Sequence, residues 1–548
     1  MNDATATAAP RAPARFLAAT LERSELVWRL GVATLTAGVA AFLFIQLSAW
    51  PPHEDETLAL FTGRGSVHDL IRTVLGERGG APLHFLFAWV VAHSGGGLIG
   101  LRIVSAVFAI ASVPLIALLV ARLADRATAL VATAIVAPSW MLLFHGVYGR
   151  MYSMFLFTAT LSYLALLSAL ARRDRRGWIL WALAMLACIA THPYGALVLG
   201  SQGVYVLYAR RVRQALPAFV AVFVLAIPMW SSDRVLASRF DVSVGGGGAK
   251  LGGPASILQY LVNVSGDFTV GWLVPRALVL LLALAGLVLL VRWRRASAAL
   301  AVCTVVTPFF FFLLTRVGSG IASPESRHLI FVLPFFAMVV ALPIVRFARR
   351  TRWRIGLPLA AAAVLALGAG EVAWGMHKTD LLYSGEPSAR AAAREAASTW
   401  LAATARPDDV LFGYDPLFLG AWEQNGSFSN TVVPRADTVL ALRVLYRAHK
   451  PLGRGVWVLD ASDTNNYDPR PTIPLLSPHP IGAFEARVFG PFLVIRSTRP
   501  TKTIREFLLQ TQAVQFVGQR IYIGDADINL LTVERALGLR TLGGTGRR

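Results

Sequence analysis

Charged side chains are scarce in this sequence. Only 15% of its 548 residues are charged and 55% are hydrophobic, which gives a mean hydropathy of +0.57. A soluble globular domain carries about 25% charged residues. Apolar runs long enough to cross a bilayer, about 18 residues or more, recur through the first two thirds of the chain. The shortage of charge therefore argues against an ordinary water-soluble protein and predicts a polytopic α-helical membrane protein.

Cysteine is nearly absent. The two cysteines, Cys188 and Cys303, each lie inside an apolar run, so the sequence contains neither a disulfide framework nor the cysteine spacing of a metal site. A phosphate-binding loop is missing as well, because the glycine run "VGGGGAK" (244–250) lacks the Lys-Ser/Thr ending of such a loop. Its composition predicts a mobile connection between spans. The sequence therefore does not indicate a nucleotide-binding protein.

Acidic residues are outnumbered by basic ones, 31 to 52, for a formal net charge of +21. Such an excess can indicate a nucleic-acid partner, but most of the arginines stand in short clusters between apolar runs. That distribution is typical of the cytoplasmic loops of membrane proteins. We therefore predict that this chain contacts membrane lipids and no nucleic acid.

The apolar segments predict about eleven transmembrane helices together with interfacial helices. The segment 81–93 is too short to cross a bilayer comfortably and is predicted to lie in the interface or to be re-entrant. The predicted spans are 28–50, 101–121, 127–146, 151–171, 178–191, 194–209, 215–231, 273–291, 297–315, 328–345 and 355–374.

The arginine clusters predict how these spans are oriented. A disordered N-terminus (1–27) in the cytoplasm and alternating spans place every major cluster on the cytoplasmic side. The membrane domain (28–375) would then expose its first loop, and everything after about residue 376, on the extracytoplasmic side of an inner (plasma) membrane. The clusters concerned are Arg122 with Arg126, 172–176, 210–213, 292–295 and 346–354.

The composition changes after the last span, and the segment 376–548 is long enough to have its own core. Helical patterns cover 387–405 and 503–513, and buried-strand patterns cover 408–414, 455–461 and 492–497. This mixture predicts a C-terminal extracytoplasmic α/β domain, with a loop rich in Asn, Asp and Pro at 460–480.

Three carboxylates stand together where the first span ends, in "PPHEDETLAL" (51–60). A single acidic residue is common in any polar loop and does not by itself indicate a function. A cluster of acids at the membrane surface is a better functional candidate, because a carboxylate there can accept a proton from a hydroxyl group or hold a divalent cation. Asp55 and Glu56 are the candidate catalytic residues, and also the candidate ligands of such a cation.

The other predicted loops on this side each contribute polar or aromatic groups. Singly, an arginine there can reach for lipid headgroups, and a histidine can simply satisfy a helix end. Cations that share a face with carboxylates, however, suit an anionic phosphate beside a base. The groups are Arg78, His84, Arg150, Tyr152, His192, Tyr194, Arg327 and His328.

Five segments in order, "HEDETLAL", "GGAPLHFLFAW", the run from "GLRIVSAVF" to "GRMYSMFLF", "THPYGALVL" and "SPESRHLIFVLP", resemble the GT-C glycosyltransferases of the protein mannosyltransferase and aminoarabinose transferase superfamily. The resemblance covers roughly 28–345. It implies an integral-membrane enzyme that transfers a sugar, such as mannose or aminoarabinose, from a polyprenyl-phosphate donor to a lipid, glycan or protein acceptor. Direct displacement with inversion is implied as well.

The resemblance also implies roles for individual residues. Asp55 matches the essential acid of the first loop, as the base that activates the acceptor or organises it, and Glu56 is its companion. Arg150 and Arg327 match arginines that bind the donor phosphate, and Arg78 would stand in for a lysine of some relatives. Substrate-binding positions would be His84, Tyr152, His192, Tyr194 and His328, the last of which stands where many members have Tyr.

Two other functions remain open on the sequence alone. A transporter or lipid flippase would also have many spans and buried charge, although its ionisable groups would lie near the bilayer centre rather than at one end of the spans. An inactive scaffold for envelope assembly would use the C-terminal domain to bind a partner. The requirement for a divalent cation is open too.

Overall fold

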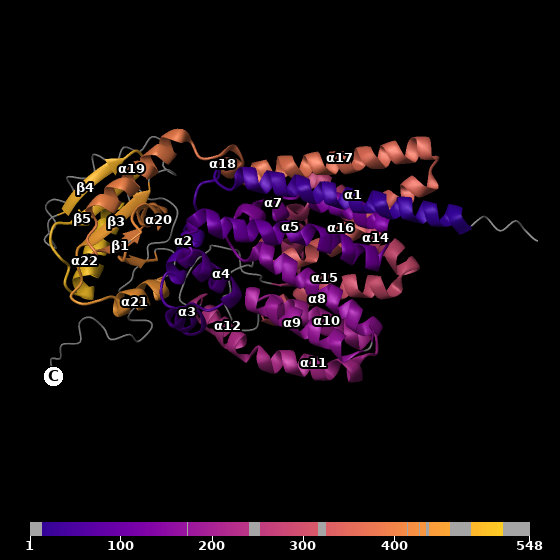
Figure 1. Cartoon of the computed structure of the whole chain (residues 1–548), viewed down its shortest axis with the longest axis horizontal. Coiled ribbons are helices and arrows are strands. Elements are labelled where there is room, and N and C mark those ends of the chain that lie inside the picture. The colour runs from indigo at the N-terminus through magenta and orange to yellow at the C-terminus, as the bar shows by residue number, and fades with distance from the viewer. Residues whose placement is uncertain are drawn as a thin grey trace, which may run out of the picture.

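In the computed structural model, described here for residues 14–172, 174–240, 253–315, 325–413, 415–426, 428–434, 438–460 and 484–518, a bundle of long helices carries a sheet-containing domain at one end (Figure 1). The predicted glycine-rich connection 244–250 and almost all of the predicted loop 460–480 lie outside the described residues. Residues 1–13 also lie outside the described residues. The rest of the predicted disordered N-terminus, 14–27, is instead the beginning of helix α1 (Ala14–Gln46).

Seven helices in the described part of the chain are long and apolar enough to cross a membrane. Two further pairs qualify if each bent pair counts as one span, which gives up to nine. The seven lie in α1 (Ala14–Gln46), α5 (Gly97–Leu123), α8 (Tyr152–Arg172), α14 (Leu273–Trp293), α15 (Arg295–Thr315), η2 (Ser326–Val332) with α16 (Leu333–Arg350), and α17 (Trp353–Lys378). The bent pairs are α6 (Arg126–Val136) with α7 (Trp140–Val147) and α11 (Val212–Leu225) with α12 (Ile227–Phe240).

The prediction of a polytopic helical membrane protein is therefore confirmed, and its count of eleven spans stays a prediction. The two predicted spans that fall short are α9 (Arg175–Thr191) and α10 (Gly195–Tyr208), with 17 and 14 residues. The segment predicted to be interfacial or re-entrant forms α4 (Pro82–His93), a helix of 12 residues. The remaining helix of the bundle is α13 (Pro254–Phe268).

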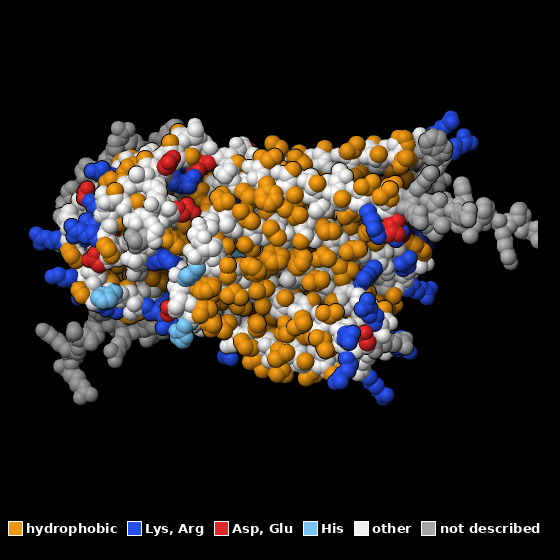
Figure 2. Space-filling view, in the orientation of Figure 1, with side chains coloured by type: hydrophobic (Ala, Val, Ile, Leu, Met, Phe, Trp, Pro, Cys, Tyr) orange, Lys and Arg blue, Asp and Glu red, His pale blue; other side chains and the backbone are white. Residues whose placement is uncertain are grey.

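The surface of the bundle explains why these helices suit a bilayer. On the face shown in Figure 2 a broad hydrophobic band separates charged groups at the two ends. Inside, the most buried span is Ser326–Arg350, of which 83% is enclosed by other helices, whereas only 11% of Arg354–Lys378 is enclosed. A bilayer replaces water around such an apolar band, so exposure of large hydrophobic side chains there carries no cost.

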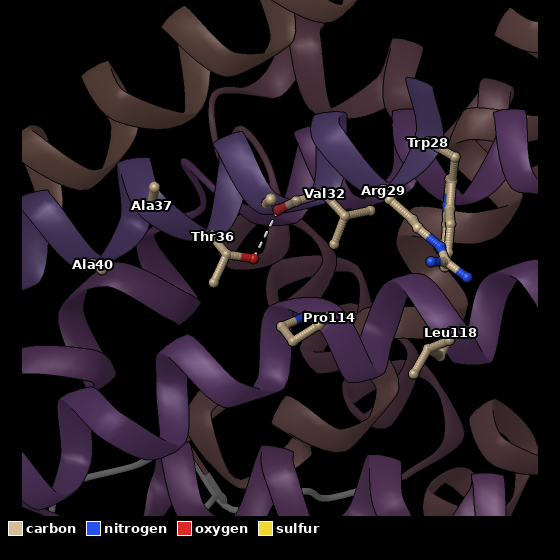
Figure 3. Close-up of a pocket in the computed structure, with 9 residues that line it drawn as sticks. Trp28, Arg29, Val32, Thr36, Ala37, Ala40, Pro114 and Leu118 are labelled. Carbon is tan, nitrogen blue, oxygen red and sulfur yellow. Dashed lines mark hydrogen bonds between the residues drawn. The ribbon is translucent and has the colours of Figure 1, made fainter. Parts of the chain in front are cut away.

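A groove of about 540 Å³ runs between α1 and α5 (Figure 3). Its wall is apolar even at Thr36, because the Thr36 hydroxyl donates to the Val32 carbonyl at 2.8 Å within the helix. Pro114 and Leu118 form the wall on α5. The groove lies along the part of α1 that is away from α2, so it is separate from the site described below.

The bend between α6 and α7 carries the chain toward the end where the acids lie. Pro138 has no amide hydrogen and cannot continue a helix, and Ser139 caps the new helix by accepting from the Leu142 amide at 3.3 Å. The two helix axes differ by 58°. Tyr148, Gly149 and Arg150 follow the end of α7 and are thereby placed beside the first loop.

The first loop is folded rather than extended. It contains α2 (Glu54–Gly63), α3 (Val67–Thr73), the π turn η1 (Val74–Arg78) and α4. Its apolar side chains form a small core of their own, in which Leu60, Val74 and Phe85 are buried together with Leu419 of the C-terminal domain.

The C-terminal domain, described from Ser388 to Gly518, contains a mixed sheet. In its described part the sheet has five strands in the order β2-β1-β3-β5-β4. Strand β1 is parallel to β2 and β3, whereas β5 is antiparallel to β3 and β4. The elements are α19 (Ser388–Thr404), β1 (Val410–Gly413), α20 (Asp415–Gln424), β2 (Thr431–Val433), α21 (Thr438–Arg447), β3 (Gly455–Asp460), β4 (Phe484–Phe489), β5 (Phe492–Ser497) and α22 (Ile504–Gly518), preceded by α18 (Asp380–Ser384).

The C-terminal domain packs directly on the first loop. Trp422 stacks on Phe61 with ring centroids 5.5 Å apart. Arg64 donates to the carbonyls of Phe428 at 3.2 Å and Asn430 at 2.6 Å. The sheet domain therefore lies at the same end of the bundle as the predicted catalytic acids (Figure 1).

Candidate active site

The site begins at the N-terminus of α2. His53 caps this helix, because its Nδ1 accepts from the Asp55 amide at 3.1 Å and its own amide donates to Glu56 Oε2 at 2.9 Å. Neighbouring residues of a helix point about 100° apart. Asp55 and Glu56 therefore face different surroundings, although they are adjacent in the chain.

Glu56 points into the protein and is fully buried. Its two carboxylate oxygens accept from Arg102 Nε at 2.9 Å and Nη2 at 2.8 Å, and Oε1 also accepts from the Gly149 amide at 2.7 Å. Burial opposes ionisation, but Arg102 and these hydrogen bonds hold the pKa of Glu56 below its ordinary value. Glu56 thus joins α2, α5 and the end of α7, and its predicted catalytic role stays a prediction.

Arg102 reinforces the same junction. Its Nη1 donates to the carbonyls of Leu47 at 2.8 Å and Trp50 at 2.9 Å, and its Nη2 donates to that of Pro51 at 2.8 Å. These carbonyls follow the end of α1, where helix hydrogen bonds are missing. One buried cation therefore fixes both the exit of the first span and the first turn of α2.

Asp55 is more open, with 29% of its side chain exposed. Its Oδ2 accepts from the Tyr148 hydroxyl at 3.1 Å, and its Oδ1 lies 3.7 Å from Arg150 Nη1. Burial opposes ionisation, but surrounding positive charge, mainly that of Arg150, lowers the pKa of Asp55 well below its ordinary value. The smaller contributions come from His53, Arg327 and Arg78. Asp55 is therefore a carboxylate at neutral pH.

Three arginines from three separate segments surround this carboxylate electrostatically. Arg150 follows α7 and also donates to the Asp55 carbonyl at 3.2 Å. Arg327, in η2, lies with its guanidinium carbon 5.0 Å from the centroid of the Tyr152 ring and pairs with Glu325 at 2.7 Å. Arg78, at the end of η1, lies 4.5 Å from the centroid of the Phe85 ring and donates to Thr62 at 3.3 Å. Burial and the charge of Arg150 both lower the pKa of Arg78.

Four of the predicted substrate-binding residues form one aromatic cluster. The ring of Tyr152 lies 5.8 Å from that of His192 and 6.0 Å from that of His328. The two histidine rings lie 5.3 Å apart, and the ring of Tyr194 lies 5.2 Å from that of His328. Tyr152 also lies under Arg327, so this cluster continues inward from the cations.

His84 lies near Arg78, on helix α4. It is buried and its ring lies 5.3 Å from that of Phe85, which is the ring under Arg78. Burial and the charges of Arg150 and Arg78 hold the pKa of His84 well below its ordinary value. A neutral His84 can donate or accept a hydrogen bond at neutral pH without adding to the positive charge.

Sequence reasoning did not find Arg102 or Tyr148. Arg102 had a signal, because a single arginine inside an otherwise apolar span needs a buried partner. Tyr148 had no such signal. Its position beside Asp55 depends on the bend before α7 and on the cap of α2, both of which are long-range features.

The donor set does not fit the divalent cation considered for Asp55 and Glu56. The Glu56 oxygens are occupied by Arg102 and two backbone amides, and Asp55 lies against Arg150. Among the described residues, moreover, no group of three or more His, Cys, Asp or Glu side chains is close enough to hold a metal ion.

The helical bundle with its C-terminal sheet domain has the fold of the GT-C glycosyltransferases. Residues 79–206 match the sequence model of the family described as dolichyl-phosphate-mannose-protein mannosyltransferase, and form a domain of this family. The predicted resemblance and the predicted enzyme class, a polyprenyl-phosphate-sugar-dependent glycosyltransferase, are thereby confirmed. Arg102, Arg150 and Tyr152 lie inside the match, whereas Asp55 and Arg327 lie outside it.

Solved structures share the fold. ArnT from Cupriavidus metallidurans bound to undecaprenyl phosphate matches with a TM-score of 0.57 at 16% identity, over 85% of this chain and 97% of that one. The same protein in the apo state gives 0.56 at 14% identity, with the same coverage. The Archaeoglobus fulgidus oligosaccharyltransferase in complex with Zn and sulfate gives 0.50 at 11% identity, over 78% and 68%. A comparison of the sequence with curated proteins gives no significant match.

Proposed function

We propose that this chain transfers a sugar, mannose, aminoarabinose or a similar one, from a polyprenyl-phosphate donor to a lipid, glycan or protein acceptor. The proposal rests mainly on one arrangement at the end of a membrane bundle: the Asp55 carboxylate lies 3.7 Å from Arg150 Nη1, and Arg327 and Arg78 are close enough to lower its pKa as well. A structural relative, ArnT, binds undecaprenyl phosphate. A lipid-linked donor would reach such a site from within the bilayer and bring its own phosphate.

The arginines serve the leaving group. When the bond between the sugar and the phosphate breaks, the electron pair stays on the phosphate oxygen and negative charge grows on the departing lipid phosphate. Guanidinium groups bind phosphate oxygens in paired hydrogen bonds. Cations already in position stabilise that developing charge, and the loss of one preorganised hydrogen-bond donor to a developing negative charge costs about 3–4 kcal/mol in other enzymes.

Asp55 serves the acceptor. Its carboxylate takes the proton of the acceptor hydroxyl while the acceptor oxygen bonds to the anomeric carbon and the phosphate leaves from the opposite side. General-base help of this kind contributes about 10²–10⁴-fold. One displacement inverts the anomeric carbon and needs no covalent sugar–enzyme intermediate.

Arg150 links the two roles. It lies against Asp55 and lowers the pKa of that carboxyl. A donor phosphate would compete with Asp55 for the Arg150 guanidinium. Binding of the donor would therefore return Asp55 toward a higher pKa, which makes it a better base at the moment when it is needed.

The reaction would take place on the extracytoplasmic face. Helix α2, which contains Asp55, lies at the end of the bundle that carries the C-terminal domain (Figure 1). The arginine clusters 172–176, 210–213 and 346–354 would remain in the cytoplasm under the positive-inside rule. This orientation places the N-terminus inside and the C-terminal domain outside, with eleven crossings of an inner (plasma) membrane.

The test is to incubate the purified full-length protein with a panel of polyprenyl-phosphate sugars and to follow the release of polyprenyl phosphate. Asp55→Asn is compared with Asp69→Asn, a matched change at an exposed acid of α3 in the same loop. We expect release to be lost in Asp55→Asn and kept in Asp69→Asn. Full activity of Asp55→Asn would remove Asp55 from the mechanism.

A further inference from the structure

The turn that ends in Arg78 is held by the C-terminal domain. We propose that Arg443 and Arg447, on α21, are positioning residues that fix the Arg78 guanidinium for the donor phosphate. This inference rests on the proposed function, because it gives Arg78 its role there. It adds that the sheet domain, far along the chain, completes the donor site.

The backbone around Arg78 is unusual and needs support. Residues Val74–Arg78 form a π turn, and the next three residues, Gly79, Gly80 and Ala81, have φ values of +77°, +71° and +48°. Single-turn π segments are rare and occur often at functional sites. An alanine with positive φ costs free energy that surrounding contacts must offset. A local sequence preference alone does not explain this conformation.

One support comes from the membrane domain. The Ser232 hydroxyl of α12 accepts from the Gly80 amide at 2.8 Å and donates to the Val74 carbonyl at 3.0 Å. A single side chain thus closes the turn across its ends. Gly79 packs so closely on the backbone of α12 that a Cβ atom there would clash with the Ser232 carbonyl and with Leu236.

The second support comes from α21. Arg443 Nη1 donates to the Glu77 carbonyl at 2.6 Å and to the Gly76 carbonyl at 3.3 Å. Arg447 pairs with the Glu77 carboxylate at 2.8 Å and donates to the Thr73 hydroxyl at 3.1 Å. These contacts satisfy carbonyls that a π turn leaves exposed at its end, and they hold Glu77, the residue directly before Arg78.

Helix α21 is suited to this task. Arg443 and Arg447 are four residues apart and therefore lie on one face of the helix. Ala441, Leu442 and Leu445 are buried in the core of the sheet domain. The helix is thus anchored by its apolar side while its arginines contact the first loop, and Figure 1 places α21 next to α3.

Arg78 itself is buried, with 6% of its surface exposed. A buried guanidinium cannot follow its ligand by swinging on a long flexible side chain, so its position depends on where the backbone holds it. A shift of the turn by about 1 Å would be enough to weaken a paired hydrogen bond to phosphate and to cost rate. The contacts of α21 with Glu77 therefore affect donor binding, because they fix the position of Arg78.

The experiment uses the full-length protein and polyprenyl monophosphate, the product lipid, as the probe. Its dissociation constant is measured for wild type, Arg443→Ala/Arg447→Ala, Arg78→Ala and the triple variant. The matched control is Arg499→Ala/Arg505→Ala, at two exposed arginines of the same domain. We expect about tenfold weaker binding in the α21 variant, as for the loss of one charge-assisted hydrogen bond, and wild-type binding in the control.

The decisive comparison is between Arg78→Ala and the triple variant. If α21 acts through Arg78, removing its arginines adds nothing once Arg78 is gone, and the two variants bind alike. A further loss in the triple variant that is as large as in the wild-type background would overturn the inference and leave the proposed function standing. Wild-type binding and transfer by Arg78→Ala would overturn both the inference and the phosphate role of Arg78.

Exchanging the charges of Glu77 and Arg447 distinguishes the loss of this ion pair from general misfolding of the variant. Arg447→Glu alone places a carboxylate against Glu77 and should loosen the turn, whereas Glu77→Arg/Arg447→Glu restores an attractive pair. We expect the double variant to recover most of the binding lost by Arg447→Glu, together with slow amide exchange over 73–80. Recovery of amide protection without recovery of binding would contradict the inference.

Discussion

The Arg150 guanidinium contacts both the side chain and the main chain of Asp55. Its Nη1 lies 3.7 Å from the Asp55 carboxylate and 3.2 Å from the Asp55 carbonyl oxygen. The two residues are 95 positions apart in the sequence, so the contact joins the first loop to the turn after α7. A cation that is shared between a base and a substrate phosphate makes donor binding and base strength depend on each other.

This sharing predicts a change in pH dependence. In wild type the lowered pKa keeps Asp55 ionised, so kcat/KM for transfer should not fall until the pH is well below the ordinary aspartate range. In Arg150→Ala the burial of Asp55 remains while its main cation is lost, and the pKa rises. The residual activity should therefore fall at a higher pH on acidification. An acid limb that is identical in the two proteins would contradict this account.

Arginine at positions 150 and 327 should not be replaceable by lysine. A lysine keeps the charge but loses the planar pair of donors that matches a phosphate. We expect Arg150→Lys and Arg327→Lys to lower kcat/KM by about 10- to 100-fold, which corresponds to about 1.4–2.7 kcal/mol. Arg72→Lys, at an exposed ion pair of α3, is the matched control. Steady-state transfer rates decide the question, and wild-type rates in both lysine variants would exclude paired recognition.

The pair of Glu56 and Arg102 should act on stability. Its side chains are 0% and 2% exposed, so Glu56→Gln leaves a buried guanidinium without its counter-ion. Breaking such a pair typically costs about 3–5 kcal/mol. Asp69 and Arg72 are about half exposed, and Asp69→Asn should cost about 1 kcal/mol or less. Unfolding of the two variants in detergent, followed by circular dichroism, should separate them clearly. Equal losses would show that the burial of Glu56 is not what holds the loop.

Chelation should leave transfer unchanged. The oxygens of Glu56 are occupied by hydrogen-bond donors, and Asp55 is paired with a cation. Transfer measured before and after dialysis against EDTA should therefore be the same within error. A loss that added Zn²⁺ or Mn²⁺ restores would contradict this reading of the donor set.

Removal of the C-terminal domain should affect the donor as well as the acceptor. A chain that ends before residue 380 loses Arg443 and Arg447, which hold the turn before Arg78. We expect a higher KM for the donor, with kcat for the remaining transfer changed less. An unchanged donor KM in a folded truncated chain would assign the domain to the acceptor or to stability alone.

The sequence predicted those parts of the structure that depend on periodicity. The long apolar helices, and the strands β1, β3 and β5, lie where their patterns predicted them. The apolar composition of a span or a buried strand is enough to indicate its surroundings. Strands β2 and β4 were not predicted. Strand β2 has three residues, and β4 is half exposed along its length, so neither has a distinct apolar run.

The site was predictable only in its outline. Loops on one side of a membrane share a face, and this explains why Asp55, Arg150 and Arg327 could be expected near one another. The different surroundings of Asp55 and Glu56 could not be predicted from the sequence. They depend on the helix cap at His53 and on Arg102, which comes from another helix. The contact of α21 with the turn before Arg78 joins Arg443 to Glu77, 366 positions apart in the sequence, which no local pattern encodes.

The structure of the protein with bound polyprenyl monophosphate tests the central claim most directly. We predict phosphate oxygens within hydrogen-bond distance of at least two of Arg150, Arg327 and Arg78, and an Arg150–Asp55 separation greater than the present 3.7 Å. A phosphate bound at the opposite end of the bundle, or one that leaves all three guanidinium groups out of reach, would contradict the account.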